Sequence, residues 1–326
     1  MNRATHGADR LAAVLEREFG LSGAADVTHV YSEADATYIV SGPSGPTHVL
    51  KVAAPGRIAD VTLQVSLLAH VERSDPGIPV PRVVPTRRGE PFCRTVVGGE
   101  SRLVHLSTFL AGRPLELAAL NSRLVTDIAT TQHRLQAVLE SFPDAGAVVP
   151  VRHPWALDAV LDYPPLVEEH LDAGQRAYAE SVTARYAALA AGPAARLPRQ
   201  VIHGDFNLSN LLTAGRRVSG VIDFGDCVIG PRVHDVAIAL AYLAMRDIGA
   251  RARFSAEYCD RLAALGGLDE DERAMLPLLI AARVVMVLAL GRDTARRSPD
   301  RAEYALRYDA PAADLLRALR DEEADK

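Results

Sequence analysis

Two short stretches of the chain carry side chains that could do chemistry: HGDFNLSN at residues 203–210 and IDFGD at residues 222–226. At the edges of short β-rich runs, they place four oxygen-bearing side chains: Asp205, Asn210, Asp223 and Asp226. Strand ends and tight loops are where a scaffold holds reactive groups. Carboxylate and amide oxygens suit Mg²⁺ together with phosphate oxygens. No Cys/His spacing accompanies them, so a zinc site is not indicated.

These stretches favour phosphoryl transfer, which needs a cation on the phosphates, a positive group that holds them, and a group that deprotonates the acceptor hydroxyl. Lys51 can supply the positive group. Apart from Lys326 it is the only lysine, and the other strongly basic residues are arginines. A compact ammonium group reaches between phosphate oxygens, whereas a guanidinium is a planar fork. We therefore expect Lys51 to hold phosphates; the alternative is a chance surface lysine.

The first third of the chain is predicted to be rich in strands. Residues 28–52 contain two β-rich runs around a Gly/Pro/Ser turn, which predicts a hairpin that includes Lys51. Residues 60–74 show apolar side chains at helical spacing. Residues 78–92 and 101–110 are interpreted as further strands.

The rest of the chain is predicted to be mostly helical. Residues 117–142 indicate one long helix, and residues 163–192 one or two more. Two short β runs at 211–215 and 218–224 interrupt the helices and frame the chemistry-bearing stretches. We therefore predict an α+β protein with a β-rich lobe at residues 1–110 and a mostly helical lobe at residues 111–326.

Composition excludes several classes of protein. The 326 residues are 48% hydrophobic and 24% charged, with a net charge of −5, so neither nucleic acid nor an anionic membrane is indicated as a partner. Three scattered cysteines favour a reducing cytosol over a disulfide framework. The N-terminus lacks the apolar block of a signal peptide. The apolar stretch 276–290 carries Arg283 and is short for a membrane span, so we expect a buried helix in a cytoplasmic protein. The oligomeric state is left open.

The paired motifs HGDFNLSN and IDFGD resemble the catalytic signature of the aminoglycoside phosphotransferase family, small-molecule kinases with a bilobal, protein-kinase-like fold. HVLKV resembles the family's ATP-lysine strand, LSTFLAGRPL its hinge, and HDVAIALAYL the helix after the metal loop. Several segments are similar to the hydroxylysine kinase branch in particular. The resemblance covers most of the chain.

The resemblance implies roles for individual residues. Asp205 would orient the acceptor hydroxyl and accept its proton. Asn210 and Asp223 would hold Mg²⁺, and Lys51 would touch the phosphates of ATP. The remaining nucleotide contacts would come from the hinge backbone and the loop over the phosphates, at Thr108, Leu110 and Ser32.

The chain departs from the family pattern in two places. The loop at residues 32–37 lacks the glycines of a protein-kinase loop. A glutamate that usually pairs with the lysine is also missing from the helix at 60–72. Gln64 is the candidate there, with Asp60 or Glu72 as alternatives from another turn.

Three residues are candidates for the acceptor site. Arg283 interrupts an apolar helix and needs a partner, either a carboxylate elsewhere in the fold or a carboxylate of the substrate. Trp155, the only tryptophan, either covers the acceptor pocket or fills the helical core. Asp226 is either a neighbour of the metal or a loop cap. Asp235 is explained by helix capping, although the resemblance implies that it braces the catalytic loop.

We predict an ATP- and Mg²⁺-dependent kinase that phosphorylates a hydroxyl group of a small amine or amino acid such as hydroxylysine. One alternative is an antibiotic kinase that acts on an aminoglycoside or a basic peptide antibiotic, with the acidic runs 167–170 and 269–272 in its pocket. An alternative of another class is a nucleotide-binding pseudokinase without catalysis.

Overall fold

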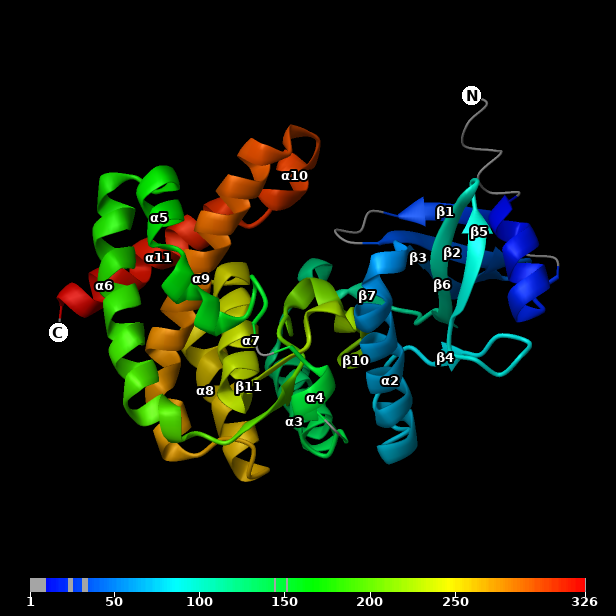
Figure 1. The fold of residues 1–326 in the computed structure, drawn as a ribbon. Helices are drawn as coiled ribbons and strands as arrows, with labels where there is room; N and C mark the ends of the chain where they lie inside the picture. Colours follow the sequence, from blue (N-terminus) through cyan, green and yellow to red (C-terminus); the bar gives the residue numbers. More distant parts are fainter. Residues whose placement is uncertain (1–9, 23–25, 31–34, 144, 151, 326) are drawn as a thin grey trace. The chain divides into compact units, whose positions relative to one another are not determined.

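The computed structural model describes residues 10–22, 26–30, 35–143, 145–150 and 152–325. The chain divides into two compact units (Figure 1). The first comprises the chain up to Gly112 together with Ser219–Gly225, and the second comprises Arg113–Val218 and Asp226–Lys326. The first is rich in strands and the second is mostly helical, so the predicted α+β class is confirmed.

An antiparallel sheet of order β1–β2–β3–β6–β4, with β5 also paired to β6, forms the first unit. Its strands are β1 (Asp26–Val30), β2 (Ala36–Gly42), β3 (Gly45–Ala53), β4 (Val83–Val84), β5 (Cys93–Val97) and β6 (Glu100–Thr108). β2 and β3 form the predicted hairpin, and Lys51 lies in β3 opposite Thr37 and His105. The strand predicted over 78–92 was wrong except at β4, because the prolines of this stretch cannot donate ladder hydrogen bonds.

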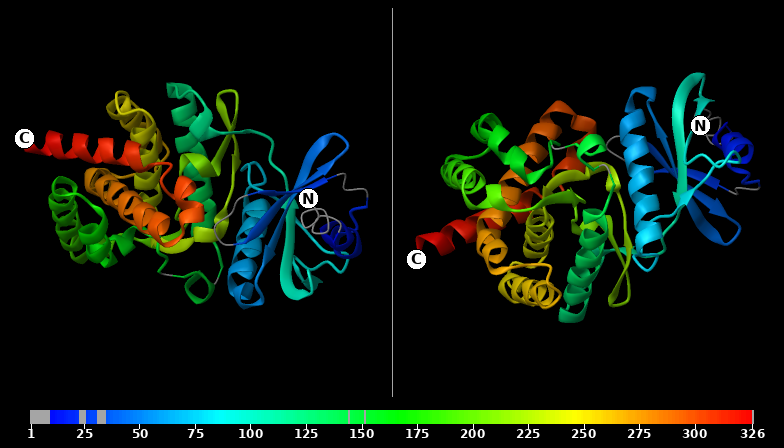
Figure 2. Two further views of the ribbon diagram at one scale, coloured as in Figure 1. Left: turned by 90° about the horizontal axis from the view of Figure 1, so that it is seen from above. Right: turned by 60° about the horizontal axis from the view of Figure 1, so that its bottom comes forward.

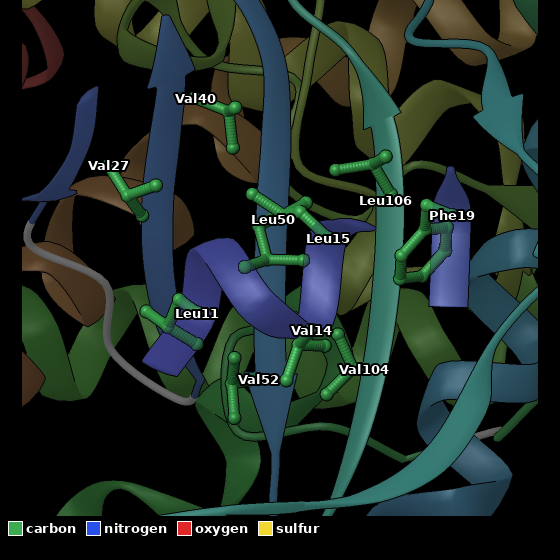
Figure 3. Packing of buried hydrophobic residues seen from close by; sticks show 10 residues of the cluster. All are labelled: Leu11, Val14, Leu15, Phe19, Val27, Val40, Leu50, Val52, Val104 and Leu106. Carbon is green, nitrogen blue, oxygen red and sulfur yellow. The ribbon is translucent and has the colours of Figure 1, made fainter. Parts of the chain in front are cut away.

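Alternation along β3 directs its side chains to opposite faces of the sheet. Leu50 and Val52 pack into the cluster of Figure 3, in which residues of the N-terminal helix, including the π-helical turn η1 (Leu15–Phe19), cover the sheet. On the opposite face, Ala53 packs against α2 (Ile58–Ser74), which η2 (Pro55–Arg57) precedes. Both views of Figure 2 show the two helical segments on opposite sides of the sheet. Lys51, between Leu50 and Val52, therefore points to the side of α2.

The second unit combines long helices with short strands. Its α-helices are α3 (Ser122–Glu140), α4 (Ala145–Val148), α5 (Pro164–His170), α6 (Ala173–Ala191), α7 (Arg232–Arg246), α8 (Arg251–Ala264), α9 (Glu270–Arg297), α10 (Ala302–Ala305) and α11 (Asp309–Ala324). Its short helical turns are η3 (Leu115–Leu117), η4 (Leu157–Asp162), η5 (Pro193–Arg196), η6 (Leu208–Asn210) and η8 (Pro299–Arg301). β8 (Arg199–Ile202) pairs with β11 (Val228–Pro231), and β7 (Arg113–Pro114) pairs with β9 (Leu211–Ala214).

The chain passes from the second unit to the first within β10 (Arg217–Val221), which pairs with β9, and returns within the turn η7 (Phe224–Asp226). Both β runs predicted around the chemistry-bearing stretches are therefore present. Hydrogen bonds attach the segment 219–225 to the rest of the first unit, and two of them come from the start of the segment. Val221 N donates to Pro79 O (2.7 Å), and Ser219 Oγ donates to Ala111 O (3.0 Å).

Helix α9 lies in the core of the second unit, where it packs against α5, α6, α7 and α11 (Figure 1). Among the described residues it is the one helix long and apolar enough to cross a membrane, but 72% of its most apolar window is buried inside the protein. Such burial is typical of the core helix of a soluble protein and agrees with the predicted buried helix.

Candidate active site

A buried carboxylate holds the loop after β8. The backbone N–H groups of His203 and Gly204 donate to the two carboxylate oxygens of Asp235, at 2.8 and 2.9 Å. Asp235 lies in the first turn of α7, is 1% exposed and makes no capping hydrogen bond. Burial raises its pKa, while the two N–H donors act in the opposite direction. Helix capping was therefore the wrong interpretation, and the bracing of the loop that the resemblance implied is confirmed.

Gly204 is required by the path of this loop. Its φ is +78°, and a Cβ at this position would lie 2.1 Å from the carbonyl oxygen of Asp226. A side chain is therefore excluded both by the backbone conformation and by contact with the chain at Asp226. The close approach of the two segments sets the position of the next residue, Asp205.

The carboxylate of Asp205 accepts hydrogen bonds on both oxygens. Oδ1 accepts from Arg283 Nη2 (2.5 Å), and Oδ2 accepts from Asn207 Nδ2 (2.7 Å) and Asn210 Nδ2 (2.8 Å). The side chain remains 19% exposed. Asp205 is thus an oriented carboxylate that solvent or a substrate can still reach.

The two asparagines have complementary functions in the loop. Asn207 caps η6, with Oδ1 accepting from Ser209 N (2.8 Å) while Nδ2 binds Asp205. Asn210 donates from Nδ2 to both the side chain and the carbonyl oxygen (3.0 Å) of Asp205, which leaves its Oδ1 for another ligand. Asn207 was not singled out from the sequence. Its position two residues after Asp205, at the start of a helical turn, is one that favours a capping asparagine.

Arg283 is enclosed in the second unit, with 1% of its surface exposed. Besides the ion pair with Asp205, its Nη1 donates to the carbonyl oxygen of Trp155 (2.9 Å), and Nη2 lies 3.5 Å from the hydroxyl of Tyr242. Of the two partners considered for Arg283, the structure contains the protein carboxylate, and that carboxylate is the predicted catalytic Asp205. The ion pair with Asp205 is among the interactions that hold the pKa of Arg283 above its usual value against burial.

Two aromatic rings flank the guanidinium of Arg283. Its Cζ lies 4.9 Å from the ring centroid of Trp155 and 5.6 Å from that of Tyr242, within the range of cation–π attraction. Trp155 is half-buried, so it both packs against Arg283 and keeps some exposed surface. Tyr242 gave no signal in the sequence beyond its place in the apolar pattern of α7.

Asp226, the third acceptor-site candidate, lies in the second unit close to His153. Its Oδ1 is 3.4 Å from His153 Nε2, and both side chains are about one-third exposed or less, at 31% and 28%. His153 Nδ1 accepts from the backbone N–H of Trp155 (3.2 Å), so His153 links Asp226 to the segment that contacts Arg283. His153 was not singled out from the sequence.

In the first unit, Lys51 pairs with Asp223. Nζ of Lys51 lies 3.2 Å from Oδ1 of Asp223, with the side chains 20% and 54% exposed. Asp223 has φ = 64° and is the one non-glycine residue with a positive φ among those the structure describes. A residue held in this sparsely populated conformation is a feature of functional sites, where surrounding structure fixes it.

Gln64 lies on α2 and is 5% exposed. A Cβ on Gly225 would be 3.6 Å from its Nε2 and 3.4 Å from Asp223 Oδ1, which places the amide beside the segment that carries Asp223. The partner of Lys51 was left open, with Gln64 as the candidate, and the structure pairs Lys51 with the carboxylate of Asp223, which can also neutralise its charge. Asp60 pairs instead with Arg57 (2.9 Å).

The hinge residues differ in the backbone groups that they offer. The N–H and the hydroxyl of Thr108 both bind the backbone of Arg82, at 2.9 Å each. In the described part of the chain, the N–H of Leu110 donates to no other backbone group. Ser32, the predicted phosphate contact, lies outside the described residues.

The predicted metal ligands are one carboxylate, Asp223, and one amide, Asn210, and they belong to the first and the second unit, respectively. The donor set fits Mg²⁺, which takes one or two protein carboxylates and completes its shell with phosphate oxygens and water. Within the described ranges no group of three or more His, Cys, Asp or Glu side chains could hold a metal ion.

A family model of the phosphotransferase enzyme family (APH) matches residues 26–277, which include both chemistry-bearing stretches. The chain belongs to this family. This APH-family member is a small-molecule kinase, whose acceptor is an alcohol group.

Similar proteins agree with this assignment. The hydroxylysine kinase of Danio rerio is 26% identical over 318 residues, covering 90% of this chain and 85% of the relative. The homoserine kinase of Pseudomonas aeruginosa (strain LESB58) is 30% identical over 195 residues, covering 59% of this chain and 56% of the relative.

Among solved structures, an amicoumacin kinase in complex with AMP-PNP, Ca²⁺ and Ami has a TM-score of 0.66 at 17% identity, with 97% of this chain and 96% of that chain covered. A likeness at this identity concerns the fold. The protein-kinase-like fold predicted for this APH-family kinase is confirmed.

Proposed function

We propose that this kinase transfers the γ-phosphoryl group of ATP, with Mg²⁺, to a hydroxyl group of a small amine or amino acid, with hydroxylysine as the first candidate. The observation that carries the proposal is the carboxylate of Asp205, oriented by three donors and still partly exposed. The matches to a hydroxylysine kinase and a homoserine kinase support a hydroxy amino acid, because both names denote such acceptors.

In the proposed reaction, Asp205 orients the acceptor hydroxyl and takes its proton as the oxygen attacks the γ-phosphorus. The bond from that phosphorus to the β-phosphate oxygen breaks, and ADP leaves. Lys51 contacts the phosphates of the nucleotide, and the N–H of Leu110, which binds no backbone acceptor in the described part of the chain, donates to the base. Asn210 Oδ1 and Asp223 would hold Mg²⁺, which supplies positive charge to the phosphate oxygens when bound.

The alternative of an antibiotic kinase finds support in the fold of the amicoumacin kinase, but a polycationic acceptor needs free acidic groups. Each acidic run has members in structural contacts, while Glu168, Glu270 and Asp271 are exposed. Glu169 pairs with Arg296 (3.1 Å), Asp269 caps α9, and Glu272 pairs with Arg232 (2.8 Å). The preference for a small acceptor rests on the matches to the hydroxylysine kinase and the homoserine kinase.

The pseudokinase alternative is disfavoured by the complete set of residues. Asp205, Asn210, Asp223 and Lys51 are all present, whereas loss of at least one is expected in a chain that only binds nucleotide. We further propose a cytosolic location, because Cys93, Cys227 and Cys259 are all free thiols.

The test is ADP release with Mg²⁺-ATP against hydroxylysine, homoserine, ethanolamine, choline, several aminoglycosides and a basic peptide antibiotic. Asp205→Asn is the matched blank, because it keeps the size of the side chain and removes the proton acceptor. Turnover on a hydroxy amino acid that the blank lacks would support the proposal.

Turnover on an antibiotic alone would replace the proposed acceptor and keep the mechanism. Nucleotide binding without turnover on any acceptor would contradict the proposed function. Equal turnover by the wild type and Asp205→Asn would contradict the assignment of Asp205 as the base.

A further inference from the structure

The pair formed by Arg283 and Asp205 suggests a role for Arg283 in the reaction, an inference that rests on the function proposed above. We propose that Arg283 is a positioning residue for phosphoryl transfer, which holds the proton-accepting oxygen of Asp205 in place and is itself held by Trp155 and Tyr242.

The proton-accepting oxygen can be identified by counting hydrogen bonds. A carboxylate oxygen offers about two lone-pair directions. Oδ2 of Asp205 accepts from two amides, those of Asn207 and Asn210, so both of its directions are occupied. Among the residues that the structure describes, Oδ1 accepts only from Arg283, which leaves one direction for the acceptor hydroxyl. The oxygen that Arg283 holds is therefore the one that takes the proton.

Burial argues against direct binding of the acceptor by Arg283. The residue is 1% exposed, and its Nε is buried with no hydrogen-bond partner among the described residues. A substrate carboxylate cannot reach a guanidinium that is enclosed on all sides. An unpaired buried N–H also costs free energy. The position of Arg283 is therefore not optimised for the stability of the fold alone. Arg283 acts through Asp205.

The guanidinium itself has little freedom. Nη1 donates to Trp155 O (2.9 Å), and the rings of Trp155 and Tyr242 lie within 4.9 and 5.6 Å of Cζ. A planar guanidinium fixed in this way orients its Nη2–H in one direction, which a lysine ammonium at the same site could not do. Arg283→Lys therefore cannot substitute, although it keeps the charge.

The first experiment compares Arg283→Met with Arg292→Met. The Arg283→Met variant keeps most of the side-chain volume, and we expect kcat to fall about 100-fold, the effect of a misplaced catalytic group, with the nucleotide KM unchanged. Arg292 is a matched control on the same helix, about 13 Å further along, and it also binds a carboxylate, that of Asp309, through two hydrogen bonds. Its loss should lower stability and leave kcat close to that of the wild type.

The second experiment is rescue of Arg283→Ala by guanidinium ion at millimolar concentration, with equal NaCl as the salt control. Guanidinium should restore part of kcat with a saturable dependence and should not affect Arg292→Ala. Trp155, the only tryptophan, contacts the vacated site, so its fluorescence should report binding of the ion at the same half-saturation. Binding without rescue would overturn the proposal.

A crystal structure of Arg283→Met separates this inference from the proposed function. We expect the Asp205 side chain to change its torsion or to occupy more than one conformer. An unchanged, well-ordered Asp205 would overturn the positioning role, whether or not any acceptor is turned over. A wild-type enzyme that phosphorylates none of the acceptors would contradict the proposed function, and the structure of the variant would still decide the role of Arg283.

Discussion

At the scale of single residues, each unit of the kinase pairs one basic side chain with one predicted site carboxylate. Lys51 binds Asp223 in the first unit, and Arg283 binds Asp205 in the second. The two pairs differ in exposure, because Asp223 is 54% exposed whereas Arg283 is 1% exposed. The lysine pair is therefore accessible to solvent, whereas the guanidinium of the arginine pair is not.

Replacement of Lys51 by Arg tests the need for a compact ammonium. A guanidinium keeps the charge but cannot reach the same point between phosphate oxygens, so we expect the nucleotide KM to rise or kcat to collapse. Steady-state kinetics with varied Mg²⁺-ATP measures both. Since Lys51 is partly exposed, the melting temperature should change little, and wild-type kinetics in the variant would show that the ammonium is dispensable.

Gly204→Ala tests the close approach of the catalytic loop to Asp226. The added Cβ would meet a backbone oxygen at 2.1 Å, so the loop must shift, and we expect a loss of roughly 2–4 kcal/mol in the free energy of unfolding. Gly215→Ala is the control. Its φ is also positive, at +67°, but a Cβ added there would have no atom within 4 Å. That variant should lose only about 1–2 kcal/mol. Urea denaturation compares them, and equal losses would mean that the contact does not constrain the loop.

At the scale of elements, local pattern predicted the β2–β3 hairpin, α2 and the strands around the catalytic loop, because each depends on side-chain periodicity and turn residues within a few positions. Residues 78–92 were mispredicted, because valines there suggested a strand that the neighbouring prolines prevent. The spacing of residues could not predict that Asp235 binds the loop 31 residues before it. Only the family resemblance implied this contact.

The partners of the candidate site residues could also not be predicted from the sequence. Arg283 lies 78 residues from Asp205, and Lys51 lies 172 residues from Asp223. Contacts over such separations depend on how α9 and β10 pack, which no local pattern encodes. The sequence indicated that Arg283 needed a carboxylate but could not choose between the protein and the substrate.

Strand β6 carries a titratable group that should make folding sensitive to acid. Burial lowers the pKa of His105, 5% exposed and opposite Lys51, to about 3. The unfolded chain binds a proton near pH 6.5, but the folded chain does not, so stability should fall as pH drops from about 6.5 towards 3, by up to about 1.4 kcal/mol per pH unit.

His105→Leu should remove this contribution, so that its free energy of unfolding depends less on pH than that of the wild type between pH 6.5 and 4.5. Urea denaturation at several pH values measures the slopes. His29→Gln, at an exposed position of β1, is the control and should keep the wild-type slope. A slope for His105→Leu equal to that of the wild type would exclude His105 as a source of acid sensitivity.

At the scale of the whole molecule, we expect nucleotide binding to stabilise the folded chain. Binding to the folded chain alone stabilises it by mass action. Saturation with Mg²⁺ and AMP-PNP at about 100 times Kd should therefore add about 2.7 kcal/mol to stability.

Removal of the metal should weaken this stabilisation. With EDTA, the rise in melting temperature on adding AMP-PNP should shrink, and Asp223→Ala should show the same small rise with or without Mg²⁺. Thermal denaturation followed by circular dichroism measures the rise in melting temperature. A full rise for Asp223→Ala in Mg²⁺ would remove Asp223 from the metal site.

The scarcity of lysine makes the kinase unusual as a target for covalent reagents. Apart from the α-amino group, the only primary amines of the sequence are those of the Lys51 and Lys326 side chains. An ATP derivative that acylates amines would thus have a single internal point of attachment, and its label would mark the predicted nucleotide site without sequencing of many competing adducts. An endoprotease specific for lysine would, for the same reason, cut the unfolded chain internally only after residue 51, and acylation of Lys51 would block that cut.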